Sequence, residues 1–202
     1  GGTFDPIHNG HLHLARTALT QFDLDQIWFM PNGMPPHKKQ SSIESDIHER
    51  IAMTRIAIKA NKQFYLQEYE AKREKVSYSY KTMEHFRKIY PDDEFYFIIG
   101  ADSLFSIETW KHPERLFKAC IILAACRDEA ATKESLNGQI QMLKGKYGAY
   151  IKFLAMPLEH VSSHEIRKLI ESGEPVSEYI PAEVEAYIRK EGLYGSGNRK
   201  NQ

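Results

Sequence analysis

Two apolar patterns alternate along this chain, and their alternation limits the folds that it can adopt. Short runs such as FYFII at 95–99 and IILA at 121–124 are apolar at nearly every position, which is typical of strands buried on both faces. Between such runs lie segments with helical spacing, as at Leu12, Ala15 and Leu19. We therefore expect an α/β fold with a doubly wound, Rossmann-like parallel sheet and helices on both of its faces.

The same patterns place the individual elements. Strands are expected at 26–30, from 64 onward, at 94–100, at 120–125 and at 149–155. Helices are expected at 11–22, 46–60, 79–90, 113–119, 133–146, 162–173 and 180–192. The helix at 46–60 is indicated by Ile47, Ile51, Thr54 and Ile58, which share one helical face. The proline-rich and glycine-rich segment 31–42 is expected to be a long loop.

The length of the chain sets its domain organisation. A chain of 202 residues suits one domain, which we expect to span residues 1–195, with 196–202 as a disordered tail. A Gly-Gly turn normally follows a strand, yet this sequence begins at Gly1. We therefore expect that the first strand of the sheet is missing from the sequence.

Composition argues against several classes of protein. Lys plus Arg and Asp plus Glu number 27 each, so net charge gives no reason to expect nucleic acid as a partner. Cys120 and Cys126 flank an apolar run, which favours buried thiols at the ends of a strand over redox chemistry. No apolar run approaches the ~18 residues of a membrane helix, and nothing resembles a signal peptide. We expect a cytosolic protein without a membrane partner.

The opening GGTFDPIHNGHL combines features of a phosphate site. Gly1 and Gly2 allow a phosphate to approach the backbone, and the start of a helix adds free N–H groups with partial positive charge. Asn9 is the expected N-cap of that helix. His8 and His11 are three residues apart, so their imidazoles share one side of the first turn and can donate hydrogen bonds to phosphate oxygens.

Alternatives for this motif are a helix cap, solvated histidines or a metal site. A metal site held by His8 and His11 has no third ligand at an obvious spacing. The features occur together, which favours phosphate chemistry over each alternative. An unperturbed imidazole pKa near ~6.5 allows either protonation state, and a bound polyphosphate would favour the cation.

The segment VSSHEIR at 161–167 has two interpretations. Ser162 and Glu165 form a capping box before an apolar helical face. The two serine hydroxyls, the free N–H groups of a helix start and Arg167 also make a cradle for an anion. The residues alone favour the cap, and the two interpretations are compatible.

Three further residues have an equally open interpretation. Gly100 follows the strongest strand and allows close approach of a ligand at the carboxyl end of the sheet. Asp102 either accepts hydrogen bonds from a ligand or caps a helix at Leu104. Trp110 either stacks on a ring or belongs to the core.

The opening motif resembles the (T/H)xGH signature of the nucleotidyltransferase superfamily. The chain as a whole resembles the family of bacterial nicotinate-nucleotide adenylyltransferases. The matching segments occur in the order of that family, from Gly1 to about Gly195: GGTFDPIHNGHL, MPNGMPPHK, SYSYKT, FIIGADSL, Trp110 with Lys111, VSSHEIR and YIRKEGLYG.

The resemblance implies adenylyl transfer from ATP to the 5′-phosphate of nicotinate mononucleotide, giving deamido-NAD and pyrophosphate. It implies catalytic roles for His8, His11, Ser163 and Arg167. The implied ATP-binding residues are Gly1, Gly2, Thr3, Phe4, His8, His11, Lys38, Arg127, Ser162, Ser163 and Arg167. The implied residues for nicotinate mononucleotide are Ser79, Gly100, Asp102, Trp110 and Lys111. Mg²⁺ is expected to arrive with ATP and to have no protein ligands, and a homo-oligomer is compatible with the resemblance.

The sequence departs from the family pattern at three places. His164 replaces the usual Thr of the second phosphate motif, Ser79 replaces a Thr, and Asp128 with Glu129 replace a Pro-Gly after Arg127. Two other functions are compatible with the motifs: transfer to another acceptor, such as the amide mononucleotide or phosphopantetheine, and nucleotide binding without catalysis. A class I tRNA synthetase is disfavoured by the length and by the lack of an anticodon module.

Overall fold

The computed structural model describes residues 1–33, 43–73, 76–127, 130–156 and 161–196. The chain forms two compact units. The first unit is Gly1–Val76 together with Glu159–Gln202, and the second unit is Ser77–Leu158.

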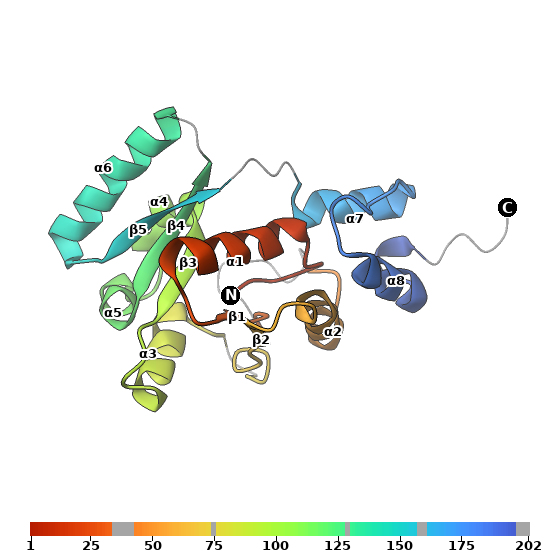
Figure 1. The fold of residues 1–202 in the computed structure, drawn as a ribbon, viewed down its shortest axis with the longest axis horizontal. Coiled ribbons are helices and arrows are strands. Elements are labelled where there is room, and N and C mark those ends of the chain that lie inside the picture. The colour runs from red at the N-terminus through yellow and green to blue at the C-terminus, as the bar shows by residue number, and fades with distance from the viewer. Residues whose placement is uncertain (34–42, 74–75, 128–129, 157–160, 197–202) are drawn as a thin grey trace, which may run out of the picture. The chain divides into compact units, whose positions relative to one another are not determined.

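The first unit combines the two ends of the chain around a small parallel sheet (Figure 1). Strands β1 (Ile27–Phe29) and β2 (Phe64–Leu66) pair in parallel. Gly2 adds a parallel bridge to Pro31, just beyond β1, and its N–H donates to the Met30 carbonyl over 3.1 Å. The helices among the described residues of this unit are α1 (Asn9–Phe22), α2 (Ile47–Ile58), α7 (Ser163–Ser172), α8 (Ala182–Glu191) and a 3₁₀ turn, η3 (Leu193–Gly195).

The second unit contains a parallel sheet in the order β3-β4-β5 (Figure 1). Its strands are β3 (Tyr96–Gly100), β4 (Ile121–Arg127) and β5 (Ile151–Met156). Its helices are α3 (Ser79–Ile89), α4 (Ala101–Ser106), the 3₁₀ turn η2 (Ile107–Thr109), α5 (Pro113–Ala119) and α6 (Ala130–Tyr147). The pattern of a strand followed by helices and a parallel strand confirms the α/β prediction in this unit.

The position of β4 between β3 and β5 explains why its sequence is apolar throughout. Ile122, Ala124 and Cys126 alternate along β4 and belong to the unit's hydrophobic core with Leu104 and Leu136. Leu123 points to the opposite face, because side chains alternate along a strand, and it is also fully buried. Both faces of β4 are therefore covered, as the apolar runs predicted. Cys120 and Cys126 are buried and are not joined in a disulfide, which confirms the predicted burial of the two thiols.

Two helices show more than their periodicity predicted. Helix α4 is implied only by the alternative that Asp102 caps a helix at Leu104, because its six residues make fewer than two turns and give no periodic signal. Helix α2 forms as predicted, and its buried residues are Arg50, Met53, Thr54 and Ile58, whereas Ile47 and Ile51 are half-buried. Arg50 turns inward because backbone carbonyls receive its guanidinium, as described below.

Other predictions about organisation stay predictions. The single domain at 1–195 and the missing first strand are untested, and the tail beyond Ser196 lies outside the described residues. None of the helices in the described part of the chain is long and apolar enough to cross a membrane.

Truncating the core of the second unit should destabilise the protein. Leu143 on α6 is fully buried, whereas its neighbour Met142 is 38% exposed. We expect Leu143→Ala to lower the free energy of unfolding by about 2–5 kcal/mol, through lost burial and the cavity left behind. Met142→Ala is the matched control and should cost far less. Equal costs in urea unfolding of the two variants would contradict the described core.

Candidate active site

The start of α1 is built around His8. Its backbone is extended, with φ −141° and ψ 172°, and it is the N-cap residue. The prediction of Asn9 as the N-cap is wrong, because Asn9 is the first helical residue. The Asn9 N–H donates to the Tyr179 carbonyl over 2.7 Å and the Asn9 amide donates to the Glu178 carbonyl over 3.0 Å. Asn9 therefore ties the start of α1 to the segment between α7 and α8.

The two imidazoles of the opening motif lie together. The ring centroids of His8 and His11 are 3.8 Å apart, and the backbone N–H of His8 donates to His11 Nδ1 over 3.3 Å. Phe4 presents its ring against His11 with the centroids 5.0 Å apart and the planes nearly perpendicular. Phe4 itself is buried, at a left-handed φ of 52°. The spacing of His8 and His11 thus predicted that their rings lie together. Phe4 restricts the rotation of the His11 ring.

Burial controls the charge of His8. Only 8% of His8 is exposed, and desolvation lowers the pKa of His8 from 6.5 to about 4. His8 is therefore neutral at pH 7 in the free protein. Its buried Nδ1 has no hydrogen-bond partner among the described residues. A neutral imidazole donates from one ring nitrogen and accepts at the other, so His8 can offer one N–H to a ligand.

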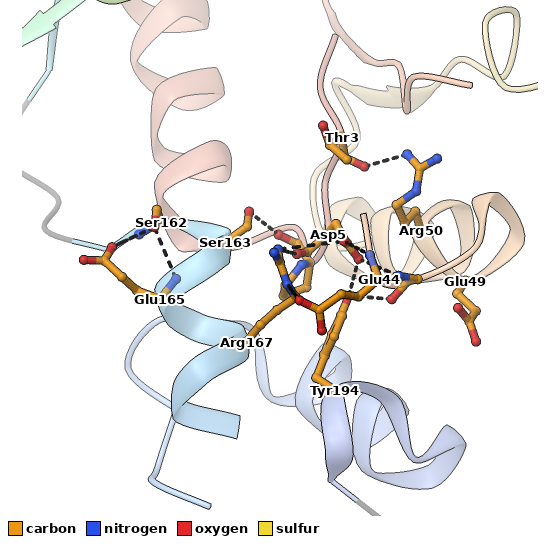
Figure 2. Close-up of polar contacts among 12 residues, drawn as sticks. Thr3, Asp5, Glu44, Glu49, Arg50, Ser162, Ser163, Glu165, Arg167 and Tyr194 are labelled. Carbon is orange, nitrogen blue, oxygen red and sulfur yellow. Dashed lines mark hydrogen bonds and ion pairs between the residues drawn. The ribbon is translucent and has the colours of Figure 1, made fainter. Parts of the chain in front are cut away.

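A buried carboxylate lies three residues before His8. Asp5 Oδ2 accepts the Glu44 N–H over 2.8 Å, and Asp5 Oδ1 accepts the Ser45 N–H over 3.2 Å. The Tyr194 hydroxyl donates to Asp5 Oδ1 over 2.7 Å. Figure 2 shows Glu44 and Tyr194 approaching Asp5 from different parts of the chain. Sequence analysis missed this role of Asp5, because its donors are distant in the sequence.

The guanidinium of Arg167 faces the loop that contains Asp5 (Figure 2). Arg167 Nη1 donates to the Asp5 carbonyl over 2.7 Å, and Nε donates to Glu44 Oε1 over 2.7 Å. Arg167 is buried, and Glu44 is half exposed. A buried guanidinium with charged and backbone partners is held in a fixed orientation.

The start of α7 has the predicted cap. The Ser162 hydroxyl accepts the Glu165 N–H over 3.3 Å, and the Ser162 N–H donates to Glu165 Oε2 over 2.7 Å, which confirms the capping box. Hydrogen bonds from Ser162 lower the pKa of Glu165. The Ser163 hydroxyl donates to the Pro6 carbonyl over 2.9 Å, so α7 is joined to the loop that precedes His8. His164 is exposed on α7.

Arg50 is a second residue that sequence analysis missed. Its Nη1 donates to the Thr3 carbonyl over 2.8 Å and to the Asn32 carbonyl over 2.9 Å. Burial lowers the pKa of Arg50, and the nearby Asp5 opposes that shift. Arg50 therefore fixes the backbone of Thr3. A side chain at Gly2 would place its Cβ 2.9 Å from the Phe4 ring, so the buried ring would have to shift to make room for it.

Comparisons with known proteins agree with this arrangement. Residues 1–169 match the cytidylyltransferase-like family model. A probable nicotinate-nucleotide adenylyltransferase of Clostridium kluyveri is 40% identical over 196 residues, which cover 96% of each chain. The relative of the same name in Carboxydothermus hydrogenoformans is 43% identical, over 96% of this chain and 95% of its own.

The chain belongs to the nicotinate-nucleotide adenylyltransferase family.

Solved structures show the same fold. The nicotinic acid mononucleotide adenylyltransferase of Plasmodium falciparum complexed with NaAD matches with a TM-score of 0.77 and 21% identity, over 96% of this chain and 95% of that one. The structure of the same protein complexed with APC matches with a TM-score of 0.76. At this identity the likeness concerns the fold, and it supports the Rossmann-like α/β class expected from the sequence.

In the second unit, three of the predicted acceptor residues lie at helix starts. Ser79 is the first residue of α3 and follows the N-cap residue Tyr78. Gly100 ends β3 and is the N-cap of α4, with an ordinary φ of −75°. Asp102 lies exposed in the first turn of α4, so the alternative of a cap is wrong.

Trp110 and Lys111 follow η2. The half-buried Trp110 ring meets the Phe97 ring of β3 edge-on, with 6.5 Å between the centroids. Lys111 Nζ lies 5.2 Å from the centroid of the Tyr78 ring, and Lys81 Nζ lies 5.9 Å from it. The half-buried Tyr78, to which sequence analysis gave no role, thus brings Lys111 close to the start of α3.

Some predicted residues have no described side chain. Lys38 lies outside the described residues. Arg127 is the last residue of β4, and only its backbone is described, paired in register with Met156.

Acid should destabilise the protein through His8. Between pH 6.5 and about 4, the unfolded chain binds a proton at this residue that the folded chain excludes. This contribution to stability is therefore complete above pH 6.5 and declines as the pH falls to about 4. The loss amounts to ~3 kcal/mol.

The measurement is urea unfolding of the wild type and of His8→Gln from about pH 8 to about pH 4. Carboxylates titrate in both proteins, so the difference between the two curves isolates His8. Identical pH dependence in the two proteins would contradict the burial of a neutral imidazole.

Proposed function

We propose that this chain transfers the adenylyl group of ATP to the 5′-phosphate of nicotinate mononucleotide, with release of pyrophosphate. The observation that carries the proposal is the pair of imidazoles, His8 and His11, at the start of α1. Membership of the family supports it, as do the NaAD and APC named in the structures of the Plasmodium falciparum relative.

The attacking group explains which chemistry the site has to supply. A nucleotide 5′-phosphate is already an anion, so it needs no general base to attack the α-phosphorus of ATP. Catalysis then consists of orientation and of stabilising the charge that develops on the phosphates. We assign His8 and His11 to the α- and β-phosphates. His8 is neutral before ATP binds, and the triphosphate favours its protonated form.

The β- and γ-phosphates are assigned to the start of α7. Arg167 supplies positive charge there, and the start of the helix supplies N–H groups. The Ser162 hydroxyl donates to Glu165 Oε2 and the Ser163 hydroxyl to the Pro6 carbonyl, so each would exchange that acceptor for a phosphate oxygen when ATP binds. The bonds from Ser163 to the Pro6 carbonyl and from Arg167 to the Asp5 carbonyl support this assignment, because they attach α7 to the loop that leads to His8.

The remaining ATP contacts involve the backbone and two cations. Gly1, Gly2, Thr3 and Phe4 are assigned to ATP through their backbone, since the Phe4 side chain is buried against His11. Lys38 and Arg127 complete the set of proposed ATP-binding residues. Mg²⁺ enters as MgATP and is treated as part of the substrate.

The acceptor is assigned to residues of the second unit. Trp110 offers an aromatic face for the pyridine ring, and the Ser79 hydroxyl and nearby backbone N–H groups hold the nicotinate carboxylate. Lys111 adds a positive charge close to the start of α3. Gly100 permits close approach, because nothing lies within 4 Å of a Cβ placed there, and Asp102 accepts from hydroxyl groups. A cytosolic location and a homo-oligomer stay predictions.

The acceptor preference tests the substrate. We expect kcat/KM for nicotinate mononucleotide to exceed kcat/KM for the amide mononucleotide, because a site that binds a carboxylate leaves its donors unpaired with the amide. Steady-state pyrophosphate release with each acceptor gives the comparison. A preference for the amide would overturn the choice of acceptor and leave adenylyl transfer intact.

His11→Ala tests the role of the imidazole pair. Removing one donor to the phosphates should lower kcat by about 10²–10³. Circular dichroism and unfolding should show that the variant keeps its fold. His48→Ala removes an exposed imidazole near the start of α2 and serves as the control. Turnover of His11→Ala close to that of His48→Ala would refute the catalytic role.

A further inference from the structure

The carboxylate of Asp5 gathers segments that the proposed chemistry does not itself use. Asp5 is 2% exposed, and its oxygens accept the N–H groups of Glu44 and Ser45 and the hydroxyl of Tyr194. The Ser45 hydroxyl donates in turn to the Tyr194 hydroxyl over 2.7 Å. Asp5, Ser45 and Tyr194 form a continuous hydrogen-bonded set, which we call the Asp5 cluster (Figure 2 shows Asp5 and Tyr194).

The Asp5 cluster includes the start of the loop that leads through Pro6 to His8, where the phosphates are proposed to bind. The backbone carbonyls of Asp5 and Pro6 receive Arg167 Nη1 and the Ser163 hydroxyl, and His8 follows two residues after Pro6. Any shift of Asp5 therefore changes the position of the carbonyls that hold the start of α7. It also moves the loop that ends in the two imidazoles.

Tyr194 fits a positioning role better than a packing role alone. It has a left-handed backbone, with φ 53° and ψ 36°, which is uncommon for a tyrosine and costs about 1 kcal/mol or more. Its burial and the neighbouring Asp5 carboxylate raise the pKa of Tyr194 above its ordinary value, so the hydroxyl keeps its proton. A strained residue whose hydroxyl donates to a buried carboxylate aligns that carboxylate.

We propose that Tyr194 and Asp5 are positioning residues for the ATP half of the reaction. The Tyr194 hydroxyl fixes the Asp5 carboxylate, and Asp5 in turn sets the position of the loop that contains His8 relative to the start of α7. This inference rests on the proposed function, because it concerns how the same site receives ATP. It makes the 3₁₀ turn η3 part of the structure that shapes the phosphate site.

Tyr194→Phe is the direct test, because it removes one hydroxyl and keeps the ring. A hydrogen bond to a charged group corresponds to about tenfold or more in an equilibrium constant. We expect KM for ATP to rise about tenfold and KM for nicotinate mononucleotide to change less than about twofold. The matched control is Ser196→Ala, which removes a hydroxyl from the same segment that donates to the Ile188 carbonyl over 3.0 Å.

A loss of stability alone would lower the active fraction and leave both KM values unchanged. An unchanged KM for ATP in folded Tyr194→Phe would therefore overturn the proposal. Equal increases in the KM of both substrates would overturn it as well. Asp5→Asn keeps the shape of the side chain and removes its charge, and it is the second variant if Tyr194→Phe does not fold.

Binding separates this inference from the proposed function. Titration calorimetry with inorganic tripolyphosphate requires no turnover. We expect the dissociation constant to be about tenfold higher in Tyr194→Phe than in the wild type and in Ser196→Ala. If the wild type released no pyrophosphate with nicotinate mononucleotide, the proposed function would fail while this difference still supported the positioning role. Equal tripolyphosphate affinity in all three proteins would refute that role.

Discussion

Burying a carboxylate requires hydrogen-bond donors for its oxygens, and this requirement organises the first unit. The donors that Asp5 receives come from residues 44 and 45 before α2 and from Tyr194 at the end of the chain. An unpaired carboxylate in this position would cost several kcal/mol. The loop GTFDPIH can therefore adopt its folded path only when both distant segments are in place. The phosphate site and the closing turn η3 depend on each other for this reason.

The electrostatics of the site follow from the same burial. Desolvation keeps His8 neutral. Arg50 donates to the Thr3 and Asn32 carbonyls, and Arg167 donates to the Asp5 carbonyl and to Glu44. The site thus combines two buried guanidinium groups with a histidine that can gain a proton. Such a site is prepared for a polyanion, since a bound phosphate supplies the negative charge that makes protonation of His8 favourable.

The features that sequence predicted are local in the chain. His8 and His11 are one turn apart, Ser162 and Glu165 form a capping box, and β4 is apolar along its length, so short-range rules place all three. The Asp5 cluster escaped prediction because Tyr194 is 189 residues away from Asp5. Arg50 escaped because a charged residue in a helical pattern indicates a solvated face, and its acceptors are carbonyls 18 and 47 residues away. Tyr78 escaped because a tyrosine at a helix start carries no signal for the lysine that packs over it.

The central claim is that the imidazoles at the start of α1 hold the α- and β-phosphates of ATP. The most direct measurement is a crystal structure of the protein with a non-hydrolysable ATP analogue. The account predicts that ring nitrogens of both His8 and His11 lie about 2.7–3.2 Å from phosphate oxygens. A triphosphate bound in the site while both rings point away from it would contradict the account.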